Sequence, residues 1–92
     1  MASIIRVDGT VEDIGWAPSL DQLQDAVGGN IEFVAIHPTW QVITGWDYMY
    51  CNDIGKLEGL QFNPIATGMM MSDWDVVVGD VVVCKIAEDE EE

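Results

Sequence analysis

Apolar residues cluster near both ends of the chain in patterns that predict β-strands. Residues 3–11 include Ile4, Ile5, Val7 and Val11 and are predicted to form a strand, and Asp8-Gly9 has the composition of a turn that closes it. A loop that contains Gly15 and Pro18 is expected to follow. Residues 76–86 give the strongest β signal because they hold six valines. Gly79-Asp80 interrupts them, either as a two-residue hairpin turn or as a bulge or bent entry; we favour the second because three-residue arms pair weakly.

The middle of the chain predicts further strands. Residues 30–37 are mostly apolar and end at Pro38, which cannot continue a central strand. Residues 41–44 and 46–51 are rich in β-branched and aromatic side chains. These two segments form either a hairpin around Gly45 or two separate short strands.

One amphipathic helix over residues 20–27 is the clearest element. Ser19 is a favourable N-cap, and Gln22 three residues later completes a capping box. Leu20, Leu23 and Val27 share one helical face, while the polar residues between them face outward. The Gly28-Gly29 pair then ends the helix.

A second, short helix is predicted to open at Asn63-Pro64 and to run to about residue 71, although Gly68 weakens the signal. The chain of 92 residues fits one domain. The predicted fold class is therefore α+β, with a small mixed sheet of four to five strands, one main helix and one short helix. The domain covers residues 1–87, and residues 88–92 form an acidic disordered tail.

The net charge of −14 narrows the choice of partners. Five of the seventeen acids lie at 88–92, so the rest of the chain keeps twelve acids against three bases, or −9. Such a surface repels long nucleic acid and anionic membranes and suits a basic protein surface. Two plainer interpretations stay open, namely simple solubility and a salt-rich host in which acidic surfaces are general.

Candidate catalytic chemistry is sparse. His37 is the only histidine, and its place before Pro38 is typical of a structural residue. No nucleophile elbow, phosphate loop or zinc-protease motif occurs. Asp73, Asp75 and Asp80 carry oxygen ligands suited to a hard cation, but acids between a helix and a strand usually serve solvation and capping. We expect no enzyme activity, no metal site and no cofactor.

The cysteines and the hydropathy pattern indicate a soluble protein in a reducing compartment. Cys51 and Cys84 lie in apolar, strand-like segments and are expected to be buried thiols without a disulfide. The N-terminus has no basic-then-apolar leader, and no apolar run reaches the roughly 20 residues of a membrane span.

Four tryptophans and two tyrosines are many for a chain of this size. Core packing is the plainer explanation, and an aromatic anchor surface for a partner is the functional one. A glycine-containing loop around Lys56 also exposes backbone amides that suit an anion. The residues predicted to bind a partner or ligand are Trp40, Trp46, Asp47, Tyr48, Lys56 and Trp74.

The order of several segments resembles a known family. The segments are residues 4–9, residues 23–32, residues 52–60, residues 63–67 and residues 78–83. Together they resemble a family of small proteins from phages, prophages and plasmids that is catalogued only as a domain of unknown function. The resemblance implies an origin in a mobile element and action in the host cytoplasm, and it brings no catalytic residues.

The leading hypothesis is a non-enzymatic accessory protein that binds and inhibits a host protein with a basic surface, such as a defence or nucleic-acid-handling factor. Its acidic surface would steer association and its aromatic residues would anchor it. One alternative is a binder that sequesters a small nucleotide-like ligand with Trp46, Tyr48 and the loop around Lys56. Another is a structural protein of the virion, and a homo-oligomer is an open alternative because valine-rich edge strands invite pairing.

Overall fold

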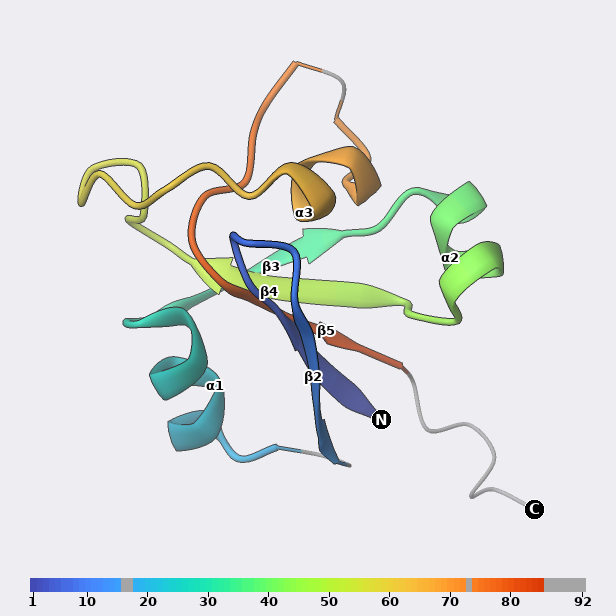
Figure 1. Cartoon of the computed structure of the whole chain (residues 1–92), viewed down its shortest axis with the longest axis horizontal. Coiled ribbons are helices and arrows are strands. Elements are labelled where there is room, and N and C mark those ends of the chain that lie inside the picture. Colours follow the sequence, from blue (N-terminus) through green and yellow to red (C-terminus); the bar gives the residue numbers. More distant parts are fainter. Residues whose placement is uncertain (16–17, 73, 86–92) are drawn as a thin grey trace.

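The fold is a five-stranded sheet with one helix on each face and a third helix at one end (Figure 1). A computed structural model describes residues 1–15, 18–72 and 74–85. The strands are ordered β2-β1-β5-β4-β3 in the sheet, and all four pairings are antiparallel. The α+β class and the strand number are confirmed, but the sheet is antiparallel throughout where a mixed sheet was expected. The predicted tail at 88–92 lies outside the described residues.

The N-terminal segment is a hairpin and not one strand followed by a loop. Strand β1, Ala2–Ile5, turns at Asp8-Gly9 and pairs with β2, Val11–Gly15. The Asp8 side chain holds the turn because Oδ1 accepts hydrogen bonds from the backbone N–H and the hydroxyl of Thr10, at 2.9 and 2.8 Å. The second strand was missed because its polar residues stand at the exposed sheet edge, where burial does not impose an apolar pattern.

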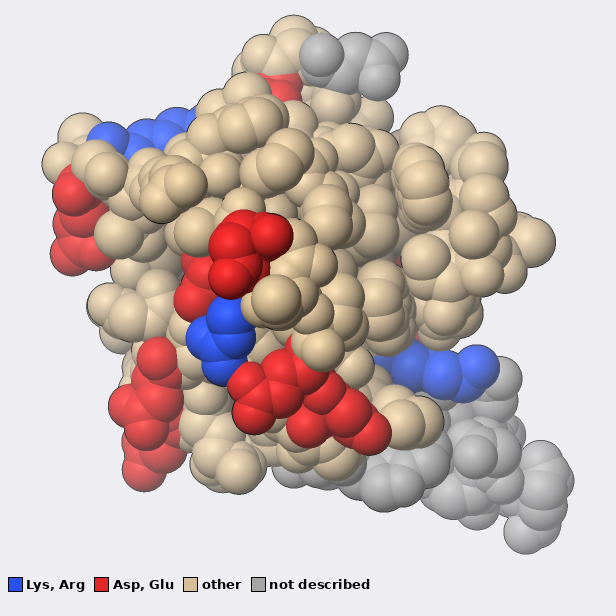
Figure 2. Space-filling model, in the orientation of Figure 1, with Lys and Arg blue, Asp and Glu red and all other residues tan. Residues whose placement is uncertain are grey.

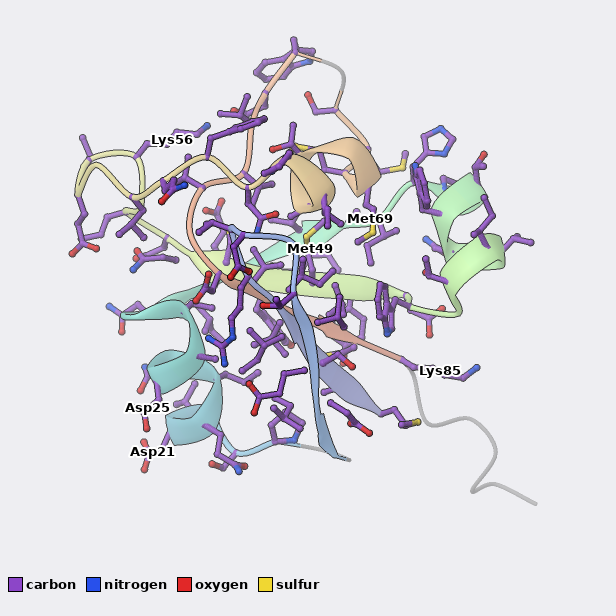
Figure 3. The ribbon with its side chains drawn as sticks, in the orientation of Figure 1. Asp21, Asp25, Met49, Lys56, Met69 and Lys85 are labelled. Carbon is purple, nitrogen blue, oxygen red and sulfur yellow. The ribbon has the colours of Figure 1, made fainter. Side chains whose placement is uncertain are left out.

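Helix α1, Leu20–Val27, forms as predicted. The Ser19 side chain accepts from the Gln22 N–H, and the Gln22 side chain accepts from the Ser19 N–H, which confirms the capping box. Leu23 and Val27 are buried against the sheet. Asp21 and Asp25 point away from the sheet on the outer side of the helix (Figure 3).

Residues 38–44 form a helix, so the predicted strand at 41–44 is wrong. Helix α2, Pro38–Thr44, has proline at its start and ends at Gly45, whose φ of 82° is left-handed. These end signals outweigh the β preference of Val42 and Ile43, which are both exposed in the helix. The neighbouring strand prediction is confirmed in β4, Tyr48–Asn52, which pairs with β3, Ile31–Ala35.

The buried side chain of Asn63 links the last helix with the segment that leads into the last strand. Helix α3, Pro64–Met69, is capped by Asn63 as predicted. Strand β5, Val81–Cys84, is entered by a bend at Gly79, which has φ 80° and donates its N–H to the Gln61 carbonyl. The bent entry is thus confirmed over the hairpin turn.

Two apolar clusters stabilise the sheet, one on each face. Met49 and Met69 lie between the sheet and α3 with Ile5, Val81 and Val83 (Figure 3). On the opposite face α1 covers Ile4 and Val82. Only part of that second face is covered, since α1 contacts β3, β4 and β5 at one end of the sheet.

Candidate binding surface

An aromatic cluster lies on the sheet face that α1 covers only in part. Antiparallel pairing places Phe33 of β3 opposite Tyr50 of β4, with Tyr48 two residues away on the same face. The Phe33 and Tyr48 rings stack with centroids 5.5 Å apart, and Tyr50 meets both rings edge to face. Phe33 is 60% exposed, so this cluster presents an apolar ring to solvent.

A second apolar surface is formed by α2. Val42 is 85% exposed and Ile43 is 65% exposed, while Trp40 is exposed beside them. From Phe33 to Trp46 the sequence has no acidic residue, lysine or arginine, although the whole chain carries a net charge of −14. On the face of the molecule that Figure 2 shows, acidic side chains lie over the middle and over the α1 side, and none lies over α2. Helix α2 itself is therefore uncharged and apolar in an acidic molecule, and the Lys85 ammonium lies beside Gly45 at its C-terminal end.

A cleft of about 400 Å³, lined by apolar as well as charged side chains, opens on the α3 side of the sheet, beside β3 and β4. Lys56 lies in its wall and forms an ion pair with Asp75, whose pKa is lowered mainly by this hydrogen bond. Glu32 and Asp53 also line the cleft, so its charged groups are three acids and one lysine. Burial, reinforced by the nearby Glu32 charge, raises the pKa of the Cys51 thiol to about 11, which keeps it protonated at neutral pH.

The predicted binding residues are spread over separate parts of the molecule. Trp40 belongs to α2, and Trp74 is 87% exposed in the loop that follows α3. Tyr48 belongs to the aromatic cluster, whereas Trp46 packs on the apolar core of the opposite face. Asp47 lies between them at the start of β4, where its backbone N–H donates to the Cys84 carbonyl at 2.8 Å.

Lys56 lies beyond the far end of β4 from Trp46 and Tyr48 (Figure 3). The structure therefore does not bring together the three groups that were expected to hold a nucleotide-like ligand. It does bring Tyr48 next to Phe33, a residue that the sequence analysis did not select. The signal was available, because Tyr48 and Tyr50 are spaced by two and must share one face of a strand. The strand opposite them was also predicted, over residues 30–37, but its pairing and register with residues 48–52 were not.

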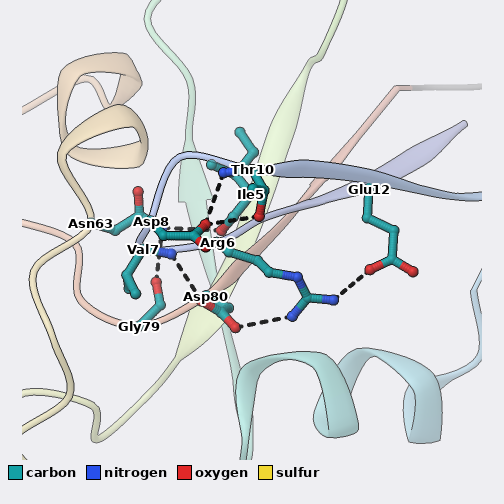
Figure 4. A network of polar contacts seen from close by, with 9 residues as sticks. All are labelled: Ile5, Arg6, Val7, Asp8, Thr10, Glu12, Asn63, Gly79 and Asp80. Carbon is teal, nitrogen blue, oxygen red and sulfur yellow. Dashed lines mark hydrogen bonds and ion pairs between the residues drawn. The ribbon is translucent and has the colours of Figure 1, made fainter.

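The polar groups considered for catalysis or metal binding have structural partners. His37 caps α2, with Nδ1 accepting from the Thr39 N–H at 3.1 Å. Asp80 accepts from Arg6 and from the Val7 N–H, and Arg6 also pairs with Glu12 (Figure 4). No three His, Cys, Asp or Glu side chains within residues 1–15, 18–72 and 74–85 are grouped to hold a metal ion. Asp73 lies outside these ranges.

Cys51 and Cys84 are both buried free thiols, on opposite faces of the sheet. None of the helices in the described part of the chain is long and apolar enough to cross a membrane.

These observations define the class: a small antiparallel α+β domain that exposes an aromatic and aliphatic surface, with the candidate polar groups engaged in structural contacts. The chain belongs to the family described as domain of unknown function (DUF3846), whose model matches residues 2–92. This match confirms the resemblance to a family of unknown function, while the origin in phages, prophages and plasmids stays a prediction. No curated protein and no solved structure matches the chain.

Proposed function

We propose that this domain is a non-enzymatic binding protein that captures and inhibits another protein with a basic surface. The observation that carries the proposal is the apolar surface of helix α2, where Val42 is 85% and Ile43 65% exposed. Leaving such side chains exposed forgoes roughly 1.5–3 kcal/mol each relative to burial. Exposed apolar residues beside an acidic surface are typical of a binding site, with the apolar part as anchor and the charged part steering the encounter.

The acidic side chains support a basic partner. Asp21 and Asp25 on α1 face outward, and Glu12 and Asp13 lie on the exposed β2. At low ionic strength such a field accelerates association with a positively charged surface and slows it with nucleic acid. Two of the three basic residues, Arg6 and Lys56, form ion pairs with acids of the same chain.

The cleft weighs against the alternative of a sequestered nucleotide. A nucleotide carries phosphate charge, and Glu32, Asp53 and Asp75 around Lys56 would repel it. A cationic group fits the same walls better. The small-ligand alternative thus has less support than binding of a basic protein.

The resemblance noted above adds a biological setting to the proposal. An origin in a phage, prophage or plasmid and action in the host cytoplasm would make the partner a host defence or nucleic-acid-handling factor. Assembly into a virion is the competing role, since assembly surfaces and inhibitory surfaces share the same apolar chemistry.

The test is affinity capture from host lysate with three tagged baits. The wild type is compared with the double variant Val42→Ser/Ile43→Ser and with Val11→Ser, a control at an exposed apolar residue of β2. We expect wild type and Val11→Ser to retain one basic protein and the α2 double variant to lose it, with release from the wild type at high salt. Equal capture by all three baits, or capture that is insensitive to salt, would contradict the proposal.

A further inference from the structure

The two edges of the sheet differ in how they are protected against pairing with another strand. Edge strand β2 carries Glu12 and Asp13, and the register of its pairing with β1 shifts between Ala2 and Ser3. Acidic side chains and bulges are common devices that prevent a foreign strand from adding to an edge. The opposite edge strand, β3, has the sequence Ile31-Glu32-Phe33-Val34-Ala35, with a single charge and no bulge in its pairing with β4.

The register of β3 shows which backbone groups face outward. The Asp53 N–H donates to the Asn30 carbonyl, so this pair and each second pair after it exchange hydrogen bonds with β4. The intervening residues Ile31 and Phe33 therefore direct their N–H and C=O groups away from β4. No backbone hydrogen bond to these groups comes from elsewhere in the described part of the chain.

The open edge is short because the segment after α3 covers the rest. The Met71 N–H donates to the Ala35 carbonyl at 3.2 Å, and the His37 N–H donates to the Met69 carbonyl at 2.8 Å. This segment forms an isolated antiparallel bridge through Ile36 and Met70. Residues 69–71 thus already pair with one end of this edge, at residues 35–37. An incoming strand would pair with the remaining part of the same edge.

The two faces of the sheet carry different kinds of side chain beside the open edge. On one face Phe33 extends from the Tyr48 and Tyr50 rings and is 60% exposed. On the other face Glu32 and Val34 border the cleft. Alternate side chains of an added strand point to opposite faces, so one set would meet the aromatic rings and the other set the acidic cleft.

We propose that an extended basic segment of the partner adds to β3 as a sixth strand. Its outward backbone groups bond to Ile31 and Phe33, its apolar side chains pack on Phe33, and its lysines or arginines meet Glu32 and the other acids of the cleft. This inference rests on the proposed function and names the chemistry of the partner.

The negative charge of this chain favours a basic segment of another protein, and not a second copy of the chain, as the strand that adds to β3. Two copies joined edge to edge would bring together two bodies with a net charge of −14 each and two cleft walls with an excess of acid. Neither copy has a cluster of basic residues to offset this repulsion, because the chain holds only three lysines and arginines.

The probe is a synthetic peptide of about nine residues that alternates lysine and valine. Two control peptides keep its length, one with glutamate for lysine and one with N-methyl groups on alternate backbone nitrogens. We measure affinity by calorimetry, and exchange rates of the Ile31 and Phe33 amides by NMR. The alternating peptide is expected to bind and to slow exchange of these two amides, and both controls are expected to bind at least about tenfold more weakly.

Three variants locate the binding. Phe33→Pro removes an outward N–H without removing a hydrogen bond to β4, and Phe33→Lys adds a like charge at the edge if the proline variant fails to fold. Both are expected to weaken peptide binding about tenfold or more, whereas Val11→Ser on the opposite edge strand β2 leaves it unchanged. Glu32→Gln is expected to weaken binding and to reduce its dependence on salt.

The outcomes separate this inference from the proposed function. Capture of a basic protein that depends on α2 but is indifferent to Phe33→Lys, with no binding of the peptide, overturns the strand addition and leaves the proposed function standing. Peptide binding at β3 without capture of any protein supports the strand addition and contradicts the proposed function. A concentration-dependent dimer of the wild type that Phe33→Lys dissociates would assign the edge to a second copy and overturn the inference.

Discussion

At the scale of single residues, Asn63 connects three parts of the fold. Its side-chain amide donates to the Ile5 carbonyl at 3.1 Å and the Gly79 carbonyl at 2.9 Å, while its oxygen accepts from the Ala66 N–H. Asn63→Ala should cost about 2–4 kcal/mol, because it removes a helix cap and leaves buried carbonyls unpaired. Ser19→Ala, an exposed cap, should cost only about 1 kcal/mol. Equal costs in urea unfolding would show that Asn63 acts as a cap alone.

Cys51 gives a prediction with a defined pH window. Burial raises its thiol pKa to about 11, above the value of about 8.5 for an unfolded cysteine. A raised pKa stabilises the fold below the unfolded value and loses that contribution as pH rises toward the folded value. The free energy of unfolding should fall by roughly 2 kcal/mol more between pH 8.5 and 11 in the wild type than in Cys51→Ala. Parallel profiles for the two proteins, measured by urea unfolding, would contradict this account.

At the scale of elements, two glycines near α3 should respond in opposite directions to alanine. Gly79 has a left-handed φ, and an added Cβ would lie 2.9 Å from Leu60 Cδ1, so Gly79→Ala should destabilise the protein by about 1–3 kcal/mol. Gly68 lies in the helix with open space at the Cβ position, so Gly68→Ala should stabilise it by about 0.5–1 kcal/mol. Thermal unfolding of both variants checks the signs. Destabilisation by Gly68→Ala would mean that α3 needs the freedom of that residue.

Local end signals decided which elements the sequence could predict. Helix α1 was found at its observed bounds because cap, amphipathic face and terminating glycine agree. Residues 41–44 of α2 predict a strand instead of a helix, because Val42 and Ile43 favour β structure and no buried face marks the helical period. For the same reason the sequence did not predict the exposed α2 surface as part of the candidate site. Apolar residues that face solvent follow neither the helical nor the strand pattern of burial. Phe33 joined Tyr48 only through pairing between distant segments, which composition does not reveal.

At the scale of the whole molecule, the net charge should make stability depend on salt. Because seventeen acids outnumber three bases, the excess negative charges repel one another more strongly in the compact state than in the expanded one. Raising the salt concentration screens this repulsion, and a gain of about 1 kcal/mol corresponds to roughly 4–8 °C in melting temperature. Scanning calorimetry at low and high sodium chloride measures the shift. A melting temperature that falls with salt would mean that the Arg6 and Lys56 ion pairs outweigh the repulsion.

The central claim is that the chain binds a protein through the apolar surface of α2 and the neighbouring open edge of the sheet. Hydrogen–deuterium exchange of the free protein and of its complex with the captured partner tests this most directly. The account predicts slower exchange at residues 31–34 and residues 38–46 in the complex, with little change at residues 11–15 of β2. Protection confined to β2 and α1, with α2 and β3 unchanged, would contradict it.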